Sequence, residues 1–300
     1  MNTKINLAGV ELKNPVMTAS GTFGSGMEYS EFVDLNKLGA VVTKGVANVP
    51  WPGNPRPRIA ETYGGMINAI GLQNPGIDVF CERDIPFLKK YDTKIIVNVC
   101  GKSERDYVEV VERLAGEPVD MLEINISCPN VKEGGIAFGQ NAANIEHITK
   151  AIKNVAKQPV IMKLSPNVTD ITEMAKAAEA GGADVLSLIN TITGMKIDIN
   201  RQTFAVANKT GGLSGPAVKP VAVRMVYQVA NAVKIPIIGM GGIATAEDAL
   251  EFILAGATAV SIGTANFHNP RTTLEVIEGI EKYMVNKGVS DINDLIGIVK

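Results

Sequence analysis

The amino-acid sequence predicts an α/β fold, a single (β/α)8 TIM-barrel domain over residues 1–300. Short runs of Val, Ile and Leu alternate with longer amphipathic stretches, which is typical of strand–helix units around a parallel sheet. Most of these runs are apolar at successive positions, as strands buried on both faces should be. Eight such units are the number that closes a barrel. No linker or break in composition divides the chain, so we expect one domain.

The candidate strands are residues 15–19, 40–45, 95–99, 121–127, 159–164, 184–190, 235–240 and 258–263. The candidate helices include 103–114, 141–156, 171–180, 218–232, 246–254 and 272–285, and a surface-packed helix is expected within 287–300. Thr245 stands at an N-cap position and Pro216 at a first helical turn, whereas Gly39, Gly182 and Gly256 stand where helices end. A doubly wound open sheet is the alternative, but no Gly-x-Gly-x-x-Gly follows the first strand.

Composition excludes several classes of protein. The chain is 46% hydrophobic and 20% charged, with a formal net charge of −2. Nucleic-acid binders usually show a basic domain, and disordered chains have fewer apolar residues. Neither a signal peptide nor an apolar stretch of about 20 residues is visible, and Cys81, Cys100 and Cys128 lack metal-ligand spacing. We therefore expect a cytoplasmic protein that binds no nucleic acid, membrane or metal.

Three connections are unusually long: residues 46–75, 128–140 and 191–215. Loops of this length inside a compact domain usually have a function. Each follows the carboxyl end of a predicted strand, and that end of a barrel carries the active site. The sequence therefore predicts one site at the barrel mouth, beneath these three connections.

Polar residues gather where the predicted strands end. Lys44, Asn98, Asn125, Lys163 and Asn190 interrupt runs that are otherwise apolar. Such groups are costly to bury without partners, so as a set they indicate one polar pocket. The alternative is that each is a structural polar group satisfied by its own neighbours.

Glycines follow the last two predicted strands. Gly241 and Gly242 come after the seventh strand, and Gly263 and Thr264 after the eighth, while Gly215 precedes Pro216. Barrel enzymes often bind phosphate at these loops, where glycine lets backbone N–H groups approach an anion. For any one glycine alone a simple tight turn is the better interpretation, but the set favours a phosphate site.

Cys128 lies in the most distinctive segment, Asn-Ile-Ser-Cys-Pro-Asn-Val from Asn125. A free thiol has a pKa of about 8.5 and can serve as a general base near neutral pH. It could equally be a nucleophile, a redox thiol or a buried structural residue. The position at the catalytic face favours a catalytic role.

The combined motifs resemble the dihydroorotate dehydrogenases over nearly the whole chain. Besides the Cys128 segment they include Thr-Ala-Ser-Gly-Thr-Phe-Gly near the start, Asn-Ala-Ile-Gly-Leu-Gln-Asn from Asn68, and Gly-Gly-Leu-Ser-Gly-Pro-Ala. Lys44, Asn98 and Lys163 occur in the same order. The resemblance implies oxidation of dihydroorotate to orotate on FMN in pyrimidine biosynthesis. It also implies that Cys128 removes the C5 proton while a hydride leaves C6 for flavin N5.

The resemblance also assigns residues to ligands. It implies that FMN contacts Ser20, Lys44, Gly45, Asn98, Asn125, Lys163 and Ile189, with its phosphate on Gly215, Gly241, Gly242, Gly263 and Thr264. It implies that dihydroorotate contacts Lys44, Asn68, Ala69, Ile70, Gly71, Leu72, Asn125, Asn190 and Thr191. The residue types suit these roles, because asparagine amides match the donors and acceptors of a cyclic ureide, and a lysine stabilises the charge of reduced flavin.

The residues after Val131, Lys-Glu-Gly-Gly-Ile-Ala-Phe-Gly, resemble the NAD-linked soluble branch. That branch implies a partner electron-transfer subunit with FAD and a 2Fe–2S cluster, arranged around a homodimer core in a heterotetramer. Three cysteines are too few for this chain to hold the cluster itself. The alternatives are a fumarate-using enzyme, another FMN-dependent pyrimidine oxidoreductase, a phosphosugar lyase with an imine on Lys163, or a non-catalytic barrel.

Overall fold

The computed structural model describes residues 1–126 and 139–299 and confirms the predicted barrel. Eight strands close on themselves, and every neighbouring pair is parallel. Each falls within a predicted strand or within one residue of it. In barrel order they are β3 (Val16–Thr18), β4 (Ala40–Val42), β7 (Lys94–Val99), β8 (Met121–Asn125), β9 (Val160–Lys163), β10 (Val185–Leu188), β15 (Ile237–Met240) and β16 (Ala259–Ile262).

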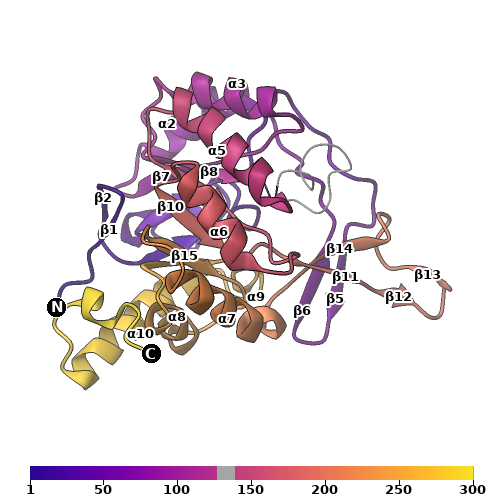
Figure 1. Cartoon of the computed structure of the whole chain (residues 1–300). Coiled ribbons are helices and arrows are strands. Elements are labelled where there is room, and N and C mark those ends of the chain that lie inside the picture. Colours follow the sequence, from indigo (N-terminus) through magenta and orange to yellow (C-terminus); the bar gives the residue numbers. More distant parts are fainter. Residues whose placement is uncertain (127–138, 300) are drawn as a thin grey trace.

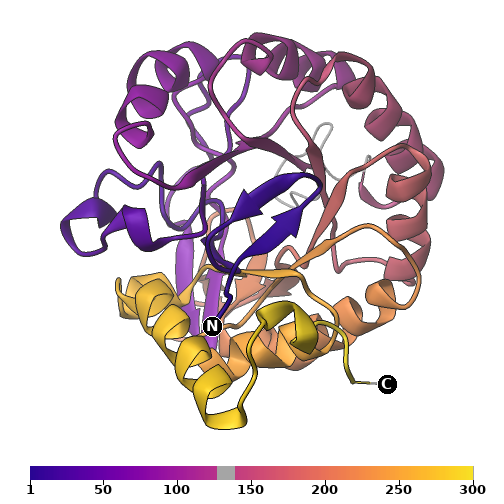
Figure 2. The same cartoon turned by 90° about the vertical axis from the view of Figure 1, so that its left-hand side faces the viewer.

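Helices form a ring outside the strands (Figure 2). The longer ones are α3 (Glu104–Leu114), α5 (Ala142–Val155), α6 (Ile171–Ala180), α7 (Lys219–Ala230), α8 (Ala246–Leu254) and α10 (Thr272–Lys287). Short segments are η1 (Tyr29–Glu31), η2 (Leu35–Lys37), α1 (Ile77–Val79), η3 (Phe80–Asp84), α2 (Ile85–Leu88), η4 (Pro216–Val218), α9 (Ala265–His268) and η5 (Ile292–Leu295). Among the described residues, no helix has the length and apolar character needed to cross a membrane.

Local signals fixed several helix ends. The Thr245 hydroxyl accepts a hydrogen bond from the Asp248 backbone N–H, and the Asp248 carboxylate accepts one from the Thr245 backbone N–H. The two bonds form a capping box at the start of α8. Gly182 and Gly256 have φ values of 94° and 120°, which favour glycine after a helix. The same interpretation of Gly39 is wrong. It follows a 3-10 turn, and a Cβ there would lie 2.2 Å from the Asn14 carbonyl oxygen, so close backbone approach is what requires glycine.

The amino-terminal hairpin, which the sequence analysis missed, consists of β1 (Ile5–Leu7) and β2 (Val10–Leu12). It lies across the centre of the helix ring, at the end of the barrel opposite the predicted mouth (Figure 2). The side chains of Ile5, Leu7 and Leu12 are buried. The hairpin therefore closes the bottom of the barrel with apolar side chains.

A second sheet projects beside the barrel (Figure 1) and was also not predicted. Its order is β11 (Ile192–Met195), β14 (Thr210–Ser214), β6 (Gly65–Asn68), β5 (Ile59–Thr62), and a small hairpin of β12 (Ile197–Asp198) and β13 (Thr203–Phe204) extends it. Two of the three long connections supply all of these strands. Antiparallel pairing of Asn68 with Gly212 joins them, so the connections form one structure above the mouth.

The end of the chain corrects another expectation. Residues 288–299 do not form the surface-packed helix expected within 287–300, because α10 ends at Lys287 and Gly288 takes a left-handed φ of 67°. The chain then turns back as the short η5, which buries Ile292 and Leu295. Glycine in this conformation stops a helix, and Ile292 and Leu295 then pack into the main hydrophobic core.

Candidate active site

A cavity of about 510 Å3 opens at the carboxyl ends of the barrel strands, where the sequence predicts the site. This volume lies within the range of about 300 to 1,000 Å3 that is usual for small-ligand and cofactor pockets. Nearly all of the predicted site residues line it. They are Ser20, Lys44, Gly45, Asn68, Ile70, Gly71, Leu72, Asn98, Asn125, Lys163, Ile189, Asn190, Thr191, Gly215, Gly241, Gly242, Gly263 and Thr264.

Two predicted residues stand apart. Ala69 does not line the cavity, because its side chain points the other way along the extended chain and is buried with Ile67 and Val206. Its carbonyl oxygen accepts a hydrogen bond from Asn54 Nδ2 at 3.1 Å. Cys128, the predicted base, lies outside the described residues.

A buried polar cluster lies at the base of the cavity. Lys163 Nζ is 3.1 Å from Ser20 Oγ and forms an ion pair at 3.5 Å with Glu123 Oε1. Asn98 Nδ2 donates to the same Oε1 at 2.6 Å, and Ser187 Oγ donates to Oε2 at 2.9 Å. Glu123 is 1% exposed. The sequence analysis missed it, although a carboxylate two residues before Asn125 in an apolar strand faces the same side.

The Asn98 side chain is fixed in one orientation by this cluster. An ionised carboxylate only accepts hydrogen bonds, so the Asn98 amide must turn its N–H group toward Glu123. Its Oδ1 then has no hydrogen-bond partner within residues 1–126 and 139–299, although it is buried. A Cβ on Gly45 would come within 3.0 Å of this Oδ1, so glycine keeps the space beside it open. A buried, unused acceptor indicates a ligand that offers an N–H group.

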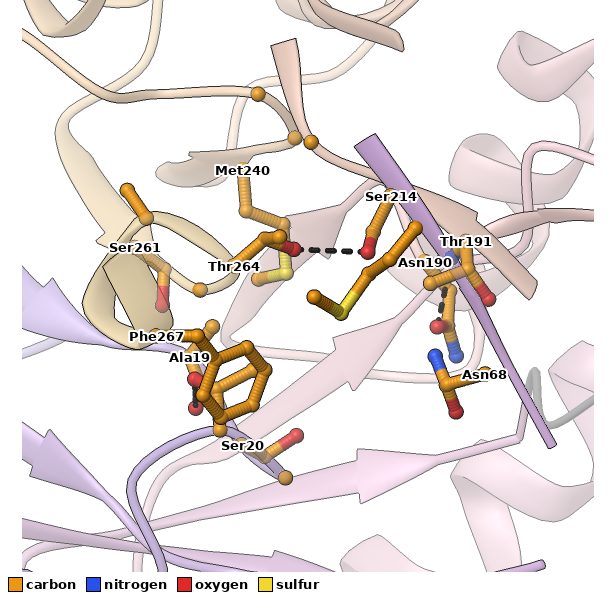
Figure 3. Close-up of a pocket in the computed structure, with 18 of the residues that line it drawn as sticks. Ala19, Ser20, Asn68, Asn190, Thr191, Ser214, Met240, Ser261, Thr264 and Phe267 are labelled. Atoms are coloured by element: carbon orange, nitrogen blue, oxygen red, sulfur yellow. Dashed lines mark hydrogen bonds between the residues drawn. The ribbon is translucent and has the colours of Figure 1, made fainter. Parts of the chain in front are cut away.

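Glycine-rich turns form one wall. Gly215, Gly241 and Gly242 have φ values of 101°, 126° and 81°, which other residues rarely adopt. A Cβ on Gly242 would also lie 2.8 Å from the Gly215 carbonyl oxygen. Beside them Thr264 Oγ1 donates to Ser214 Oγ at 2.8 Å (Figure 3). These close turns and hydroxyls lie together where the sequence predicts a phosphate site, and Ser214, which that prediction did not include, lies among them.

Another part of the lining carries the asparagines. Asn190 Nδ2 lies 3.4 Å from Asn125 Oδ1, and Asn68 Nδ2 lies 3.4 Å from the Gly212 carbonyl oxygen. Figure 3 shows Asn68, Asn190 and Thr191 on the same side of the cavity. The end of segment 68–72 is fixed by a hydrogen bond, since Asn74 Nδ2 donates to the Leu72 carbonyl oxygen at 2.8 Å. This wall therefore presents amide donors and acceptors on a braced support.

Apolar side chains complete the lining. They are Ile59, Met66, Leu213, Met240 and Phe267, none of which was predicted as a site residue. Phe267 is 51% exposed and lies beside Ala19 and Ser20 in Figure 3, at the rim. His268, the last residue of α9, also lines the cavity. Several of these residues belong to the unpredicted second sheet, so no local pattern could assign them.

Known proteins of one family match this chain along nearly its whole length. The family model described as dihydroorotate dehydrogenase matches residues 2–284. A protein of Lachnoclostridium phytofermentans named dihydroorotate dehydrogenase B (NAD(+)), catalytic subunit, is 77% identical over 300 residues and is covered in full, as is this chain. A protein of the same name from Alkaliphilus oremlandii is 66% identical, with 99% of this chain and 98% of that protein covered.

The fold likeness extends to more distant structures. The crystal structure of DHODH from Eimeria tenella in complex with ferulenol matches with a TM-score of 0.83 at 25% identity. The match covers 99% of this chain and 88% of that one. Full-length matches of this kind leave no part of the chain outside the comparison, and this chain belongs to the dihydroorotate dehydrogenase family.

Proposed function

We propose that this chain is the catalytic subunit of an NAD+-linked dihydroorotate dehydrogenase, which oxidises (S)-dihydroorotate to orotate in de novo pyrimidine biosynthesis. The observation that carries the proposal is a single cavity in which two lysines, four predicted asparagines and the glycine-rich turns converge. The names of the most similar relatives support the same activity.

FMN fits the residues present. The unpaired Asn98 Oδ1 suits a cofactor with a ring N–H group, and the turns at 215 and 241–242 suit its phosphate. The ring would be held by Ser20, Lys44, Gly45, Asn98, Asn125, Lys163 and Ile189. The phosphate would be held by Gly215, Gly241, Gly242, Gly263 and Thr264. When bound, FMN supplies the acceptor for the hydride that leaves C6 of the substrate.

The chain's own residues orient and deprotonate the substrate. Lys44 offers a positive charge for the carboxylate, while the amides of Asn68, Asn125 and Asn190 match the ureide edges. Cys128 takes the C5 proton on its sulfur, which leaves the C5–C6 double bond of orotate once the hydride has departed. Lys163 places a positive charge where negative charge develops on reduction.

The test is the anaerobic absorbance spectrum of the purified chain before and after addition of dihydroorotate. A yellow preparation should bleach. Cys128→Ala should retain FMN and lose turnover, and Cys128→Ser should be slow near neutral pH because an alcohol is a far poorer base. A yellow protein that dihydroorotate leaves oxidised, or near-normal turnover by Cys128→Ala, would contradict the assignment.

The electron acceptor needs a separate experiment. We propose that electrons leave this chain for a partner subunit that carries FAD and a 2Fe–2S cluster, and that two copies of this chain form the core of the assembly. The isolated chain should then reduce an artificial dye but not NAD+, and should sediment as a dimer. NAD+ reduction by the isolated chain, or turnover with fumarate, would contradict this part of the proposal.

A further inference from the structure

Glu123 is a buried carboxylate to which the proposed function gives no role. It lies on β8 inside the barrel at 1% exposure, and its partners are all polar. A buried charge of this kind is costly unless it is paired and hydrogen-bonded, and a well-packed apolar residue is often as stable in its place. Its presence inside an otherwise apolar barrel therefore points to a function.

The strand register brings its partners together. Asn98 on β7 pairs directly with Glu123 on β8, and Lys163 on β9 pairs with Ser187 on β10. Asn98 and Lys163 both line the cavity, whereas Glu123 and Ser187 do not. Glu123 therefore lies behind the two cavity residues that the proposed function places against the flavin.

Two consequences follow from these contacts. The carboxylate holds the N–H side of the Asn98 amide, so that Oδ1 remains the unpaired acceptor beside Gly45. It also balances the charge of Lys163, because the two ions lie 3.5 Å apart and both side chains are at most 5% exposed. Screening is weak at such a site, so the net charge felt by a ligand depends on both members of the pair.

We propose that Glu123 is a positioning residue that fixes the acceptor direction of Asn98 and, by offsetting the charge of Lys163, lowers the reduction potential of the bound flavin. The inference rests on the proposed function only in taking FMN as the ligand of this cavity. It requires no contact between Glu123 and the flavin or the substrate.

The experiment measures the midpoint potential of FMN in the purified chain against a reference dye, with enzymatic reduction of the mixture. Glu123→Gln removes the charge at nearly constant size. At a fixed potential the ratio of reduced to oxidised flavin should rise about tenfold, the order expected for one unit charge in partly screened protein. For a two-electron couple this is about 30 mV.

Glu123→Asp is the matched variant, because it keeps the charge while it shortens the side chain. Its flavin potential should stay within about threefold of the original ratio. Ser187→Ala removes a donor to Glu123 without changing any charge and should likewise leave the potential near the original. A structural role alone would change unfolding temperatures and leave the potential of all three variants equal.

A Glu123→Gln protein that holds FMN at the original potential overturns the inference. If Glu123→Gln loses FMN, the Glu123→Asp variant decides the question. The inference requires Glu123→Asp to bind FMN near the original potential. Loss of FMN from Glu123→Asp would also overturn the inference. The measurement uses no dihydroorotate. The flavin potential could therefore shift as expected in the variants while dihydroorotate fails to reduce the flavin. That result would contradict the proposed function and support the role of Glu123.

Discussion

At the scale of single residues, the ion pair of Lys163 and Glu123 has an energetic asymmetry. Both side chains are buried, and Asn98 and Ser187 donate further hydrogen bonds to the carboxylate. Removing one member of a buried pair leaves an uncompensated charge, which typically costs about 3–5 kcal/mol, whereas removing both can be nearly neutral. The two members should therefore be coupled in stability as well as in chemistry.

We expect Lys163→Met to lower the free energy of unfolding of the flavin-free chain by about 3 kcal/mol, the lower end of that range because two donors to Glu123 remain. Adding Glu123→Gln to this variant should recover at least half of the loss. Urea titration followed by circular dichroism measures these values, and the Glu123→Gln single variant completes a double-mutant cycle. Equal stability of the single and double variants would contradict the coupling.

Cys81 gives a prediction of pH dependence. Burial, and next the negative charge of Glu117, raises the pKa of its thiol to about 11. The thiolate is the reactive form, so a raised pKa leaves the thiol protonated and unreactive until the pH approaches 11. In a Cys128→Ser background, iodoacetamide should label Cys81 slowly at pH 8 and much faster at pH 10.5, as peptide mass spectrometry can measure. Rapid labelling at pH 8 would show that the thiol is accessible and ionised.

At the scale of elements, the segment 68–72 owes its shape to its backbone. Gly71 has a φ of 74° and Leu72 of 54°, and a Cβ on Gly71 would come within 2.6 Å of the Asn54 side chain. Asn54 in turn braces the Ala69 carbonyl. A side chain at position 71 must therefore displace the segment that we propose contacts the substrate.

Gly71→Ala should raise the KM for dihydroorotate at least tenfold and leave most of the FMN bound, because the φ of 74° and the contact with Asn54 are local to this segment. Steady-state kinetics and the flavin absorbance per chain measure the two effects. Gly116→Ala is the matched control, since nothing lies within 4 Å of a Cβ there. Equal KM values for the two variants would remove segment 68–72 from substrate binding.

At the scale of the whole molecule, the barrel was predictable because its signals are local. Apolar runs, the cap at Thr245 and the strand-end residues such as Lys163 can each be read within a few positions. The second sheet was not, because Asn68 and Gly212 are 144 residues apart and no local pattern says that they pair. Glu123 was missed for a related reason, since its partners lie on three other strands.

The polar lining of the cavity was easier to predict than the second sheet above it. Its glycines and polar side chains follow the barrel strands directly, so the topology alone brings them to one mouth. The apolar lining from Met66 and Leu213 depends on pairing between distant connections, and the side-chain direction of Ala69 depends on that pairing too. The polar residues and glycines of the cavity can therefore be found from local motifs, whereas the shape of the cavity depends on pairing between distant parts of the chain.

The second sheet has a consequence for a chain cut in two. The tip between β12 and β13 is exposed, with Ile199 at 80% and the Arg201 side chain at 82%, so trypsin should cleave after Arg201. The first fragment would keep six barrel strands with β5, β6 and β11, while the second would keep β14, β15 and β16. Each fragment completes both sheets of the other. The cleaved halves should therefore copurify through gel filtration as one particle, and two separately expressed pieces divided at this tip should reassemble into a working enzyme.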